Sequence, residues 1–248
     1  PAIVFAWDGV GLGDDGTLWG GETFLGTPGH WQRVAHLRPF RLPGGDRAGR
    51  APWRSAAAVC WELGRDCPVV IPDPIVRTAW QRRVNSPQSS AAGRLFDAAS
   101  AILLGLGETS FEGQGPMWLE AIARDPAEFP RLELRSTVEG RLELDWAPLV
   151  EWLLQAPPTI AADRADRAGA VHSSLADGIV QVADRLRALS GSSVVGLTGG
   201  VFQNRRLTEA ALAGLSARGF DVLLPVQLPC NDGGLSYGQV ADFIGRKV

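Results

Sequence analysis

Residues 2–7 of the chain, Ala-Ile-Val-Phe-Ala-Trp, are apolar at every position, and this run limits the possible folds more than any other feature. A continuous apolar run of this length is typical of a strand that is buried on both faces of a sheet. Few chains begin with such a strand unless other elements lie beside it, and the first residue is Pro1 rather than Met. We therefore expect a fragment of a longer polypeptide.

The first third of the chain predicts a β-meander, and the rest predicts alternating helices and strands. Asp15-Gly16 is a hairpin signal after the first strand. Ser89-Ser90 are placed to cap a helix, Gly105 to end it and Pro116 to begin the next one. The expected strands are 17–25, 31–37, an exposed hairpin of 131–134 with 141–144, 194–197 and 220–224, and the expected helices are 50–63, 90–104, one from 116, 162–189, 204–218 and 233–243.

A meander followed by helix–strand–helix–strand–helix is similar to the actin-like ATPase fold (ASKHA, RNase H-like), an α/β fold in which two lobes hold a nucleotide between them. We assign residues 1–80 with 225–248 to a first lobe, which we expect to be incomplete, and residues 81–224 to a second lobe.

The charge balance excludes several classes of function. With 24 basic against 27 acidic residues, the formal net charge is −3, so we expect no nucleic-acid partner. Lys247 is the only lysine, which removes P-loop and Schiff-base chemistry from the body of the chain. No apolar run approaches the roughly 18 residues of a membrane span, and no signal peptide is visible, so we expect no membrane partner.

The cysteines and histidines predict neither a disulfide framework nor a helical metal site. Three sparse cysteines are typical of a reducing cytoplasm, where we place the protein, and the first of them is expected to be a small buried apolar residue. No two histidines have the i, i+4 spacing of a metal pair, so each is expected to be structural or solvated. These residues are Cys60, Cys67, Cys230, His30, His36 and His172.

A glycine-rich turn lies between the strand at 194–197 and the next helix. Gly199 and Gly200 allow the backbone to approach a ligand closely and to adopt positive φ. Free N–H groups at a strand-to-helix turn attract phosphate, and the amide of Asn204 can hold a purine or a ribose. The alternative, a plain turn, is the one that the glycine pair alone favours.

Three aspartates each allow a structural and a functional interpretation. Asp8 follows the first strand, as a turn residue or as the carboxylate of a phosphate loop. Asp97 lies on the apolar stripe of its helix, as a solvent-facing edge residue or as a buried carboxylate that needs a partner. Asp232 precedes the last helix, as its N-cap or as a carboxylate that faces a metal or a phosphate.

Six motifs occur in a fixed order along essentially the whole chain: 7–9 with 14–22, 36–40 with 42–46, 93–97, 111–114, 197–204 and 231–234. In order and spacing they resemble the HypF carbamoyltransferase family, in its domain related to the tRNA threonylcarbamoyltransferase TsaD. This resemblance implies an ATP-dependent enzyme of hydrogenase maturation. The upstream domains of the family make carbamoyl-adenylate, and this domain moves the carbamoyl group to the C-terminal cysteine of HypE, on the way to the cyanide ligand of nickel–iron hydrogenase.

The resemblance also implies a site. A metal and backbone dipoles would neutralise the adenylate phosphate and polarise the acyl group for attack by a thiolate. The implied metal ligands are Asp8 and Asp232, with iron, zinc or magnesium as the metal; the implied nucleotide loop is Gly199, Gly200 and Asn204, with Asp97 and Gly113 near the ribose.

The chain departs from the family pattern at two points that bear on this site. The paired metal-binding histidines of the family, His-x-x-x-His, lie just upstream of the first strand, so Asp8 and Asp232 are the metal ligands expected here. Trp118 occupies a place where a Glu that touches the ribose is expected.

Two other functions stay open. One is an ATP-dependent small-molecule kinase of the same superfamily, which would release ADP. The other is a non-catalytic docking module for maturation proteins, which would bind a partner without binding ATP or metal.

Overall fold

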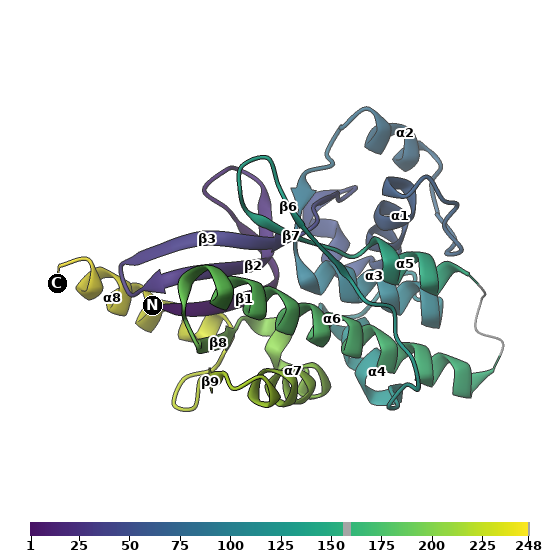
Figure 1. Ribbon diagram of the computed structural model, residues 1–248. Helices are drawn as coiled ribbons and strands as arrows, with labels where there is room; N and C mark the ends of the chain where they lie inside the picture. Colours follow the sequence, from purple (N-terminus) through teal and green to yellow (C-terminus); the bar gives the residue numbers. More distant parts are fainter. Residues whose placement is uncertain (156–159, 248) are drawn as a thin grey trace.

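The computed structural model describes residues 1–155 and 160–247, and within them one mixed sheet joins nine strands (Figure 1). The main strand order is β6-β7-β3-β2-β1-β8-β9, with β5 paired to β2 and β4 to β5. The strands are β1 Ala2–Leu12, β2 Leu18–Thr27, β3 His30–Leu37, β4 Phe40–Arg41, β5 Gln88–Ser89, β6 Glu133–Ser136, β7 Leu142–Asp145, β8 Val194–Thr198 and β9 Asp221–Leu223.

Helices of very different lengths surround this sheet, the longest being α6. The α-helices are α1 Pro52–Glu62, α2 Ile75–Gln81, α3 Ala92–Leu104, α4 Gln114–Ile122, α5 Ala147–Leu154, α6 Ala161–Ser190, α7 Arg205–Ala217 and α8 Leu235–Gly245; the 3-10 helices are η1 Gly45–Arg50, η2 Gly200–Gln203 and η3 Asp232–Gly234. None of the helices within 1–155 and 160–247 combines the length and apolar composition that a membrane-spanning helix needs.

The expected order of a meander followed by α/β crossovers is confirmed. β1, β2 and β3 form the antiparallel meander, and β8 and β9 then add parallel to β1 through the crossover helices. The assignment of two lobes stays a prediction. One sheet contains strands from both expected lobes, because β1 from residues 1–80 pairs directly with β8 from residues 81–224.

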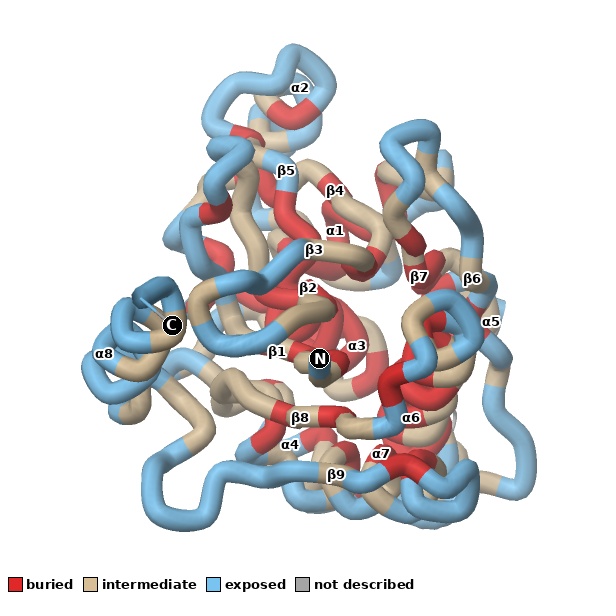
Figure 2. Tube along the Cα trace, turned by 60° about the vertical axis from the view of Figure 1, so that its left-hand side comes forward, coloured by how far each residue is buried: buried red, intermediate tan, exposed pale blue. Residues whose placement is uncertain are grey.

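β1 is the central strand, but its two faces differ in burial. Ile3, Phe5 and Trp7 are buried in the main core, whereas the alternating residues are only half-buried. The expectation that both faces are buried was therefore wrong for the face that carries Ala2, Val4 and Ala6. Figure 2 shows the buried segments concentrated along the sheet, α3 and α6, while α8 is exposed along most of its length.

The first strand is also longer than the apolar run predicts. Its pairing with β2 shifts between Trp7 and Gly11, and the strand then resumes to Leu12. Asp8 therefore lies in an irregular part of β1 rather than in a turn after it. Such irregularities bend a strand and redirect side chains, and they are common beside functional sites.

Several local predictions were corrected by contacts that are distant in sequence. Ser89 and Ser90 do not cap α3: Ser89 belongs to β5, and the Ser90 hydroxyl donates to the buried carboxylate of Glu22. The hairpin of β6 and β7 is present but not fully exposed, because β7 joins the sheet beside β3. α2 and α5 were not predicted.

Candidate functional site

A cavity of about 740 Å³ opens where β1 bends and β8 ends. Its walls come from five segments: the bend of β1, the first turns of α3, the start of α4, η2 with the residue after it, and the loop before α8. The lining residues are Asp8, Gly9, Val10, Gly93, Arg94, Phe96, Glu112, Gly113, Pro116, Met117, Glu120, Gly200, Val201, Gln203, Asn204, Asn231, Asp232 and Gly233. Its size is within the usual range of small-molecule sites.

The parallel pairing of β1 with β8 explains why Asp8 and the glycine-rich turn meet. Ala6 is paired with Thr198, so the next residues of both strands emerge at the same edge of the sheet. A Cβ atom on Gly200 would lie 3.0 Å from Oδ1 of Asp8. A side chain at position 200 would therefore crowd the carboxylate, and the glycine keeps the backbone beside it open to a ligand.

Gly199 is required by its conformation as well as by its neighbours. Its φ is +102°, and a Cβ atom there would overlap the backbone carbonyl of Trp7. Its N–H donates to the carbonyl of Cys230 over 2.6 Å, so it is used within the protein. Gly199 therefore shapes the turn without being among the residues that line the cavity.

That same hydrogen bond brings the loop before α8 to the end of β8. In this loop, Asn231 caps the 3-10 turn by accepting from the N–H of Gly233, over 3.1 Å. Asp232, which could have been the cap of the last helix, does not have that role, and its residue lines the cavity instead.

Asn204 has two observed roles. Its Oδ1 accepts from the N–H of Leu207 over 3.0 Å, which makes it the N-cap of α7. Its Nδ2 lies 2.9 Å from Nε2 of His172, and the residue lines the cavity. Both interpretations of this position, structural and ligand-facing, therefore remain compatible with its geometry.

Asp97 is buried rather than solvent-facing. It is 1% exposed, Oδ2 lies 3.2 Å from Nη1 of Arg94, and it is not among the residues that line the cavity. Burial raises the pKa of Asp97 to about 7, against the effect of Arg94, which lowers it. Asp97 contacts Arg94, which does line the cavity, and the Nη2 atom of Arg94 contacts Glu112.

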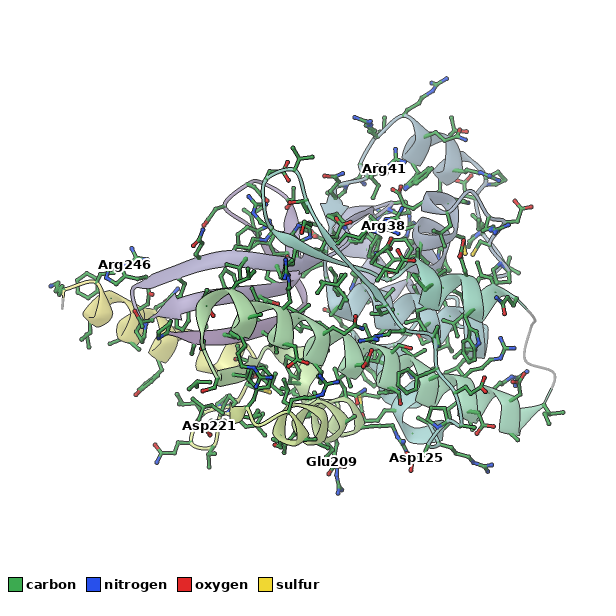
Figure 3. The ribbon with its side chains drawn as sticks, in the orientation of Figure 1. Arg38, Arg41, Asp125, Glu209, Asp221 and Arg246 are labelled. Atoms are coloured by element: carbon green, nitrogen blue, oxygen red, sulfur yellow. The ribbon has the colours of Figure 1, made fainter. Side chains whose placement is uncertain are left out.

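The wall formed by α4 is attached to the start of α7. Oε1 of Glu120 accepts from the N–H of Arg205 over 2.8 Å, and Arg206 pairs with Asp125 at the outer surface. Figure 3 shows Asp125 at the lower edge of the molecule, away from the sheet. Gly113 begins α4 with a φ of +84° and lines the cavity. Trp118 is 48% exposed and is not a lining residue.

The carboxylates at the cavity fit only some metals. Over the described ranges, no group of three or more His, Cys, Asp or Glu side chains could hold a metal ion. Zinc sites use three or four protein ligands, often nitrogen or sulfur. Magnesium is commonly bound by one or two carboxylates together with water and substrate phosphates. Asp8 and Asp232 are thus suited to a hard cation that a phosphate shares.

The structure adds residues that sequence reasoning did not select. Arg94 and Glu112 lie inside two of the six motifs, and in each a charged residue next to a glycine was the available signal. Glu120 and His172 carried no such signal, because their roles depend on α7. Together the five walls place backbone N–H groups, an arginine and two aspartates around one cavity, which suits a phosphorylated ligand.

Comparisons with known proteins show which family the chain belongs to. Residues 4–239 match the family described as "Carbamoyltransferase, Kae1-like Domain, second subdomain". The "Carbamoyltransferase HypF homolog" of Cupriavidus necator is 39% identical over 252 residues, covering 96% of this chain and 64% of that protein. The "Carbamoyltransferase HypF" of Rhodobacter capsulatus is 41% identical over 243 residues, covering 95% of this chain and 31% of that protein.

The similarity extends to solved structures. A full-length HypF in its phosphate- and nucleotide-bound form superposes with a TM-score of 0.86 at 29% identity, over 99% of this chain and 33% of that one. HypF of T. kodakarensis superposes with a TM-score of 0.79 at 27% identity, over 99% of this chain and 34% of that one. The chain thus has the mixed α/β fold of these proteins and spans between about a third and two thirds of the relatives' length.

Proposed function

The chain belongs to the carbamoyltransferase family of the Kae1-like domain, and from this we propose that it transfers a carbamoyl group from carbamoyl-adenylate to a cysteine of a partner protein. The proposal rests above all on one observation: the bend of β1, the Gly199–Gly200 turn and the loop before α8 converge on one cavity. The end of a strand such as β8, with a glycine-rich turn leading into helical residues, is suited to a phosphate.

In this proposal each wall of the cavity has a role toward the ligand. Gly200 and Asn204 face the adenylate, and Gly199 holds the turn in the conformation that makes this possible. Gly113, the N-cap of α4, also lines the cavity and is placed near the ribose in this proposal. Asp97, which is buried behind Arg94, contributes by holding that arginine rather than by touching the ribose itself.

Asp8 and Asp232 are the proposed metal ligands, and the donor set favours magnesium over zinc or iron. A divalent cation there would neutralise phosphate charge and polarise the acyl oxygen. The backbone of the next residue orients Asp8 for this role, because its Oδ1 accepts from the N–H of Gly9 over 2.7 Å.

The proposed transfer needs neither an oxidant nor a reductant, because one bond forms at the carbamoyl carbon and one breaks. The thiolate sulfur of the partner attacks the carbamoyl carbon and forms a carbon–sulfur bond. The bond from that carbon to the phosphate oxygen breaks, and AMP leaves with the electron pair. We propose a HypE-like maturation protein as the partner and its C-terminal cysteine as the acceptor, in synthesis of the cyanide ligand of nickel–iron hydrogenase.

Product analysis tests this function. The chain is incubated with carbamoyl-adenylate and a HypE-like protein, with a partner that lacks its C-terminal cysteine as the control. AMP together with a carbamoylated cysteine, detected by mass spectrometry, is the expected result. After incubation with ATP and candidate small molecules, ADP with a phosphorylated product would instead identify a kinase.

A further inference from the structure

The guanidinium of Arg94 lies at the wall of the cavity and is almost completely buried. The residue is 3% exposed, and Nη1 is 3.2 Å from Oδ2 of the equally buried Asp97. Its Nε atom has no hydrogen-bond partner among the described residues. A buried arginine with an unused donor is costly unless a further partner is supplied, so the surroundings of this group matter.

The second partner of Arg94 is of a different kind. Nη2 donates to Oε1 of Glu112 over 2.8 Å, but the Glu112 side chain is 62% exposed. Glu112 comes from the loop before α4, whereas Asp97 lies one helical turn away from Arg94 on α3. One partner of Arg94 is thus held in place by the helix, and the other is a surface carboxylate that can leave.

Glycines surround the contact between Arg94 and Glu112. A Cβ atom on Gly9 would lie 3.1 Å from Oε1 of Glu112 and 3.5 Å from Nη2 of Arg94, and one on Gly49 would lie 3.0 Å from Nη1 of Arg94. Gly9 directly follows Asp8. The ion pair between Arg94 and Glu112 therefore lies next to the part of the cavity where Asp8 and Gly200 meet. Because Gly9 and Gly49 have no side chains, neither residue separates the ion pair from the cavity.

From this arrangement we infer that Arg94 binds the phosphate of the ligand, and that the Glu112 carboxylate is paired with Arg94 at the position that this phosphate takes. Guanidinium groups bind phosphate through parallel N–H donors in a fixed fork, and one such donor is already paired with a replaceable anion. Asp97 keeps the fork oriented during the exchange. The inference rests on the proposed function and adds to it the residue that distinguishes a nucleotide from a nucleoside.

The inference predicts competition between Glu112 and the ligand. AMP must displace the carboxylate, whereas adenosine carries no phosphate and leaves the ion pair intact. In Glu112→Gln, AMP should therefore bind more tightly by roughly two- to fivefold, the range for losing one partly exposed ion pair. Adenosine affinity should change less than about twofold in the same variant.

Calorimetric titration of AMP and adenosine tests this directly. Glu108→Gln is the matched control, since Glu108 is an exposed carboxylate of the same inter-helix segment that does not line the cavity. Arg94→Lys, which keeps the charge but loses the fork, should weaken AMP binding at least about tenfold and spare adenosine.

Equal AMP affinities for wild type, Glu112→Gln and Glu108→Gln would overturn the inference, as would unchanged AMP binding in a folded Arg94→Lys variant. Either result, with adenosine still bound, would leave the proposed function standing. If neither AMP nor adenosine binds the wild-type chain, the proposed function fails and the role of Arg94 fails with it.

Discussion

Nε2 of His172 accepts a hydrogen bond from Nδ2 of Asn204 over 2.9 Å, and this contact orients the side chain that caps α7 at the cavity. Nδ1 of His172 lies 2.7 Å from the carbonyl of Ala168, so that nitrogen carries the proton and Nε2 is the acceptor. Nδ2 of Asn204 must then face His172, which leaves Oδ1 for the N–H of Leu207.

Replacing His172 with phenylalanine should destabilise the protein by about 1–3 kcal/mol, because the Asn204 amide then lacks its acceptor. The amide loses its fixed orientation, and AMP binding should weaken with it. Urea denaturation and AMP titration measure the two effects. His30→Phe, at an exposed position on β3, is the control, and equal behaviour of the two variants would contradict the orienting role.

The protonation of His172 should make stability depend on pH. Burial lowers the pKa of His172 from 6.5 to about 4. Above pH 6.5 both the folded and the unfolded histidine are neutral, and stability is fully retained. As pH falls from 6.5 to 4, only the unfolded chain gains this proton, so the histidine's contribution falls by about 3 kcal/mol.

This contribution is isolated by comparing the pH dependence of unfolding in wild type and His172→Gln. Asp97 acts in the opposite direction, because its raised pKa of about 7 makes the folded state bind an extra proton over much of the same range. Both proteins contain Asp97, so the difference between them removes its effect. Parallel curves between pH 4 and 6.5 would show that His172 is not held neutral by the fold.

Gly199→Ala should be more damaging than an ordinary substitution of a left-handed glycine. Strain at positive φ costs about 1–3 kcal/mol, and here the added methyl group also meets the carbonyl of Trp7. Gly191→Ala is the control, because it introduces the backbone strain without a steric clash: φ is +74° and no atom lies within 4 Å of its Cβ position. The melting temperature of Gly199→Ala should therefore be lower than that of Gly191→Ala. The reverse order would be inconsistent with a close approach of β1 to the turn.

Trp118→Glu should leave AMP affinity within about twofold of wild type, because Trp118 does not line the cavity. Glu120→Ala should weaken AMP binding, since Glu120 lines the cavity and fixes the start of α7 through the N–H of Arg205. Calorimetry on both variants separates the positions. A large gain of affinity in Trp118→Glu would place position 118 at the ribose after all.

Asp8→Asn and Asp232→Asn should each reduce the enhancement of AMP binding by magnesium, since each removes one of the two proposed ligands. Asp221→Asn, at the exposed start of β9, is the charge-matched control. Titrations with and without magnesium measure the effect. Adding the His-x-x-x-His segment that the sequence resemblance implies upstream of β1 should raise the metal content found by elemental analysis, and no change would count against Asp8 and Asp232 as ligands.

The features that sequence could predict are those determined locally. The apolar run of residues 2–7 marks the central strand, and the pair Gly199–Gly200 marks a turn that demands glycine. The features that it missed join distant segments: Arg94 reaches Glu112 across 18 positions, and His172 reaches Asn204 across 32. No local pattern encodes such contacts, because the packing of α3 against α4 and of α6 against α7 creates them.

The central claim is that the bend of β1 and the end of β8 form an adenylate site, and an AMP titration followed by amide NMR tests it most directly. The backbone amides of Gly9, Gly113 and Gly200 lie on three walls of the cavity. The proposal predicts that the NMR signals of all three amides shift during the titration and reach saturation at the same AMP concentration. The signal of the Gly191 amide, at the C-cap of α6, should not shift. Saturating AMP that leaves these three amides unmoved would contradict it.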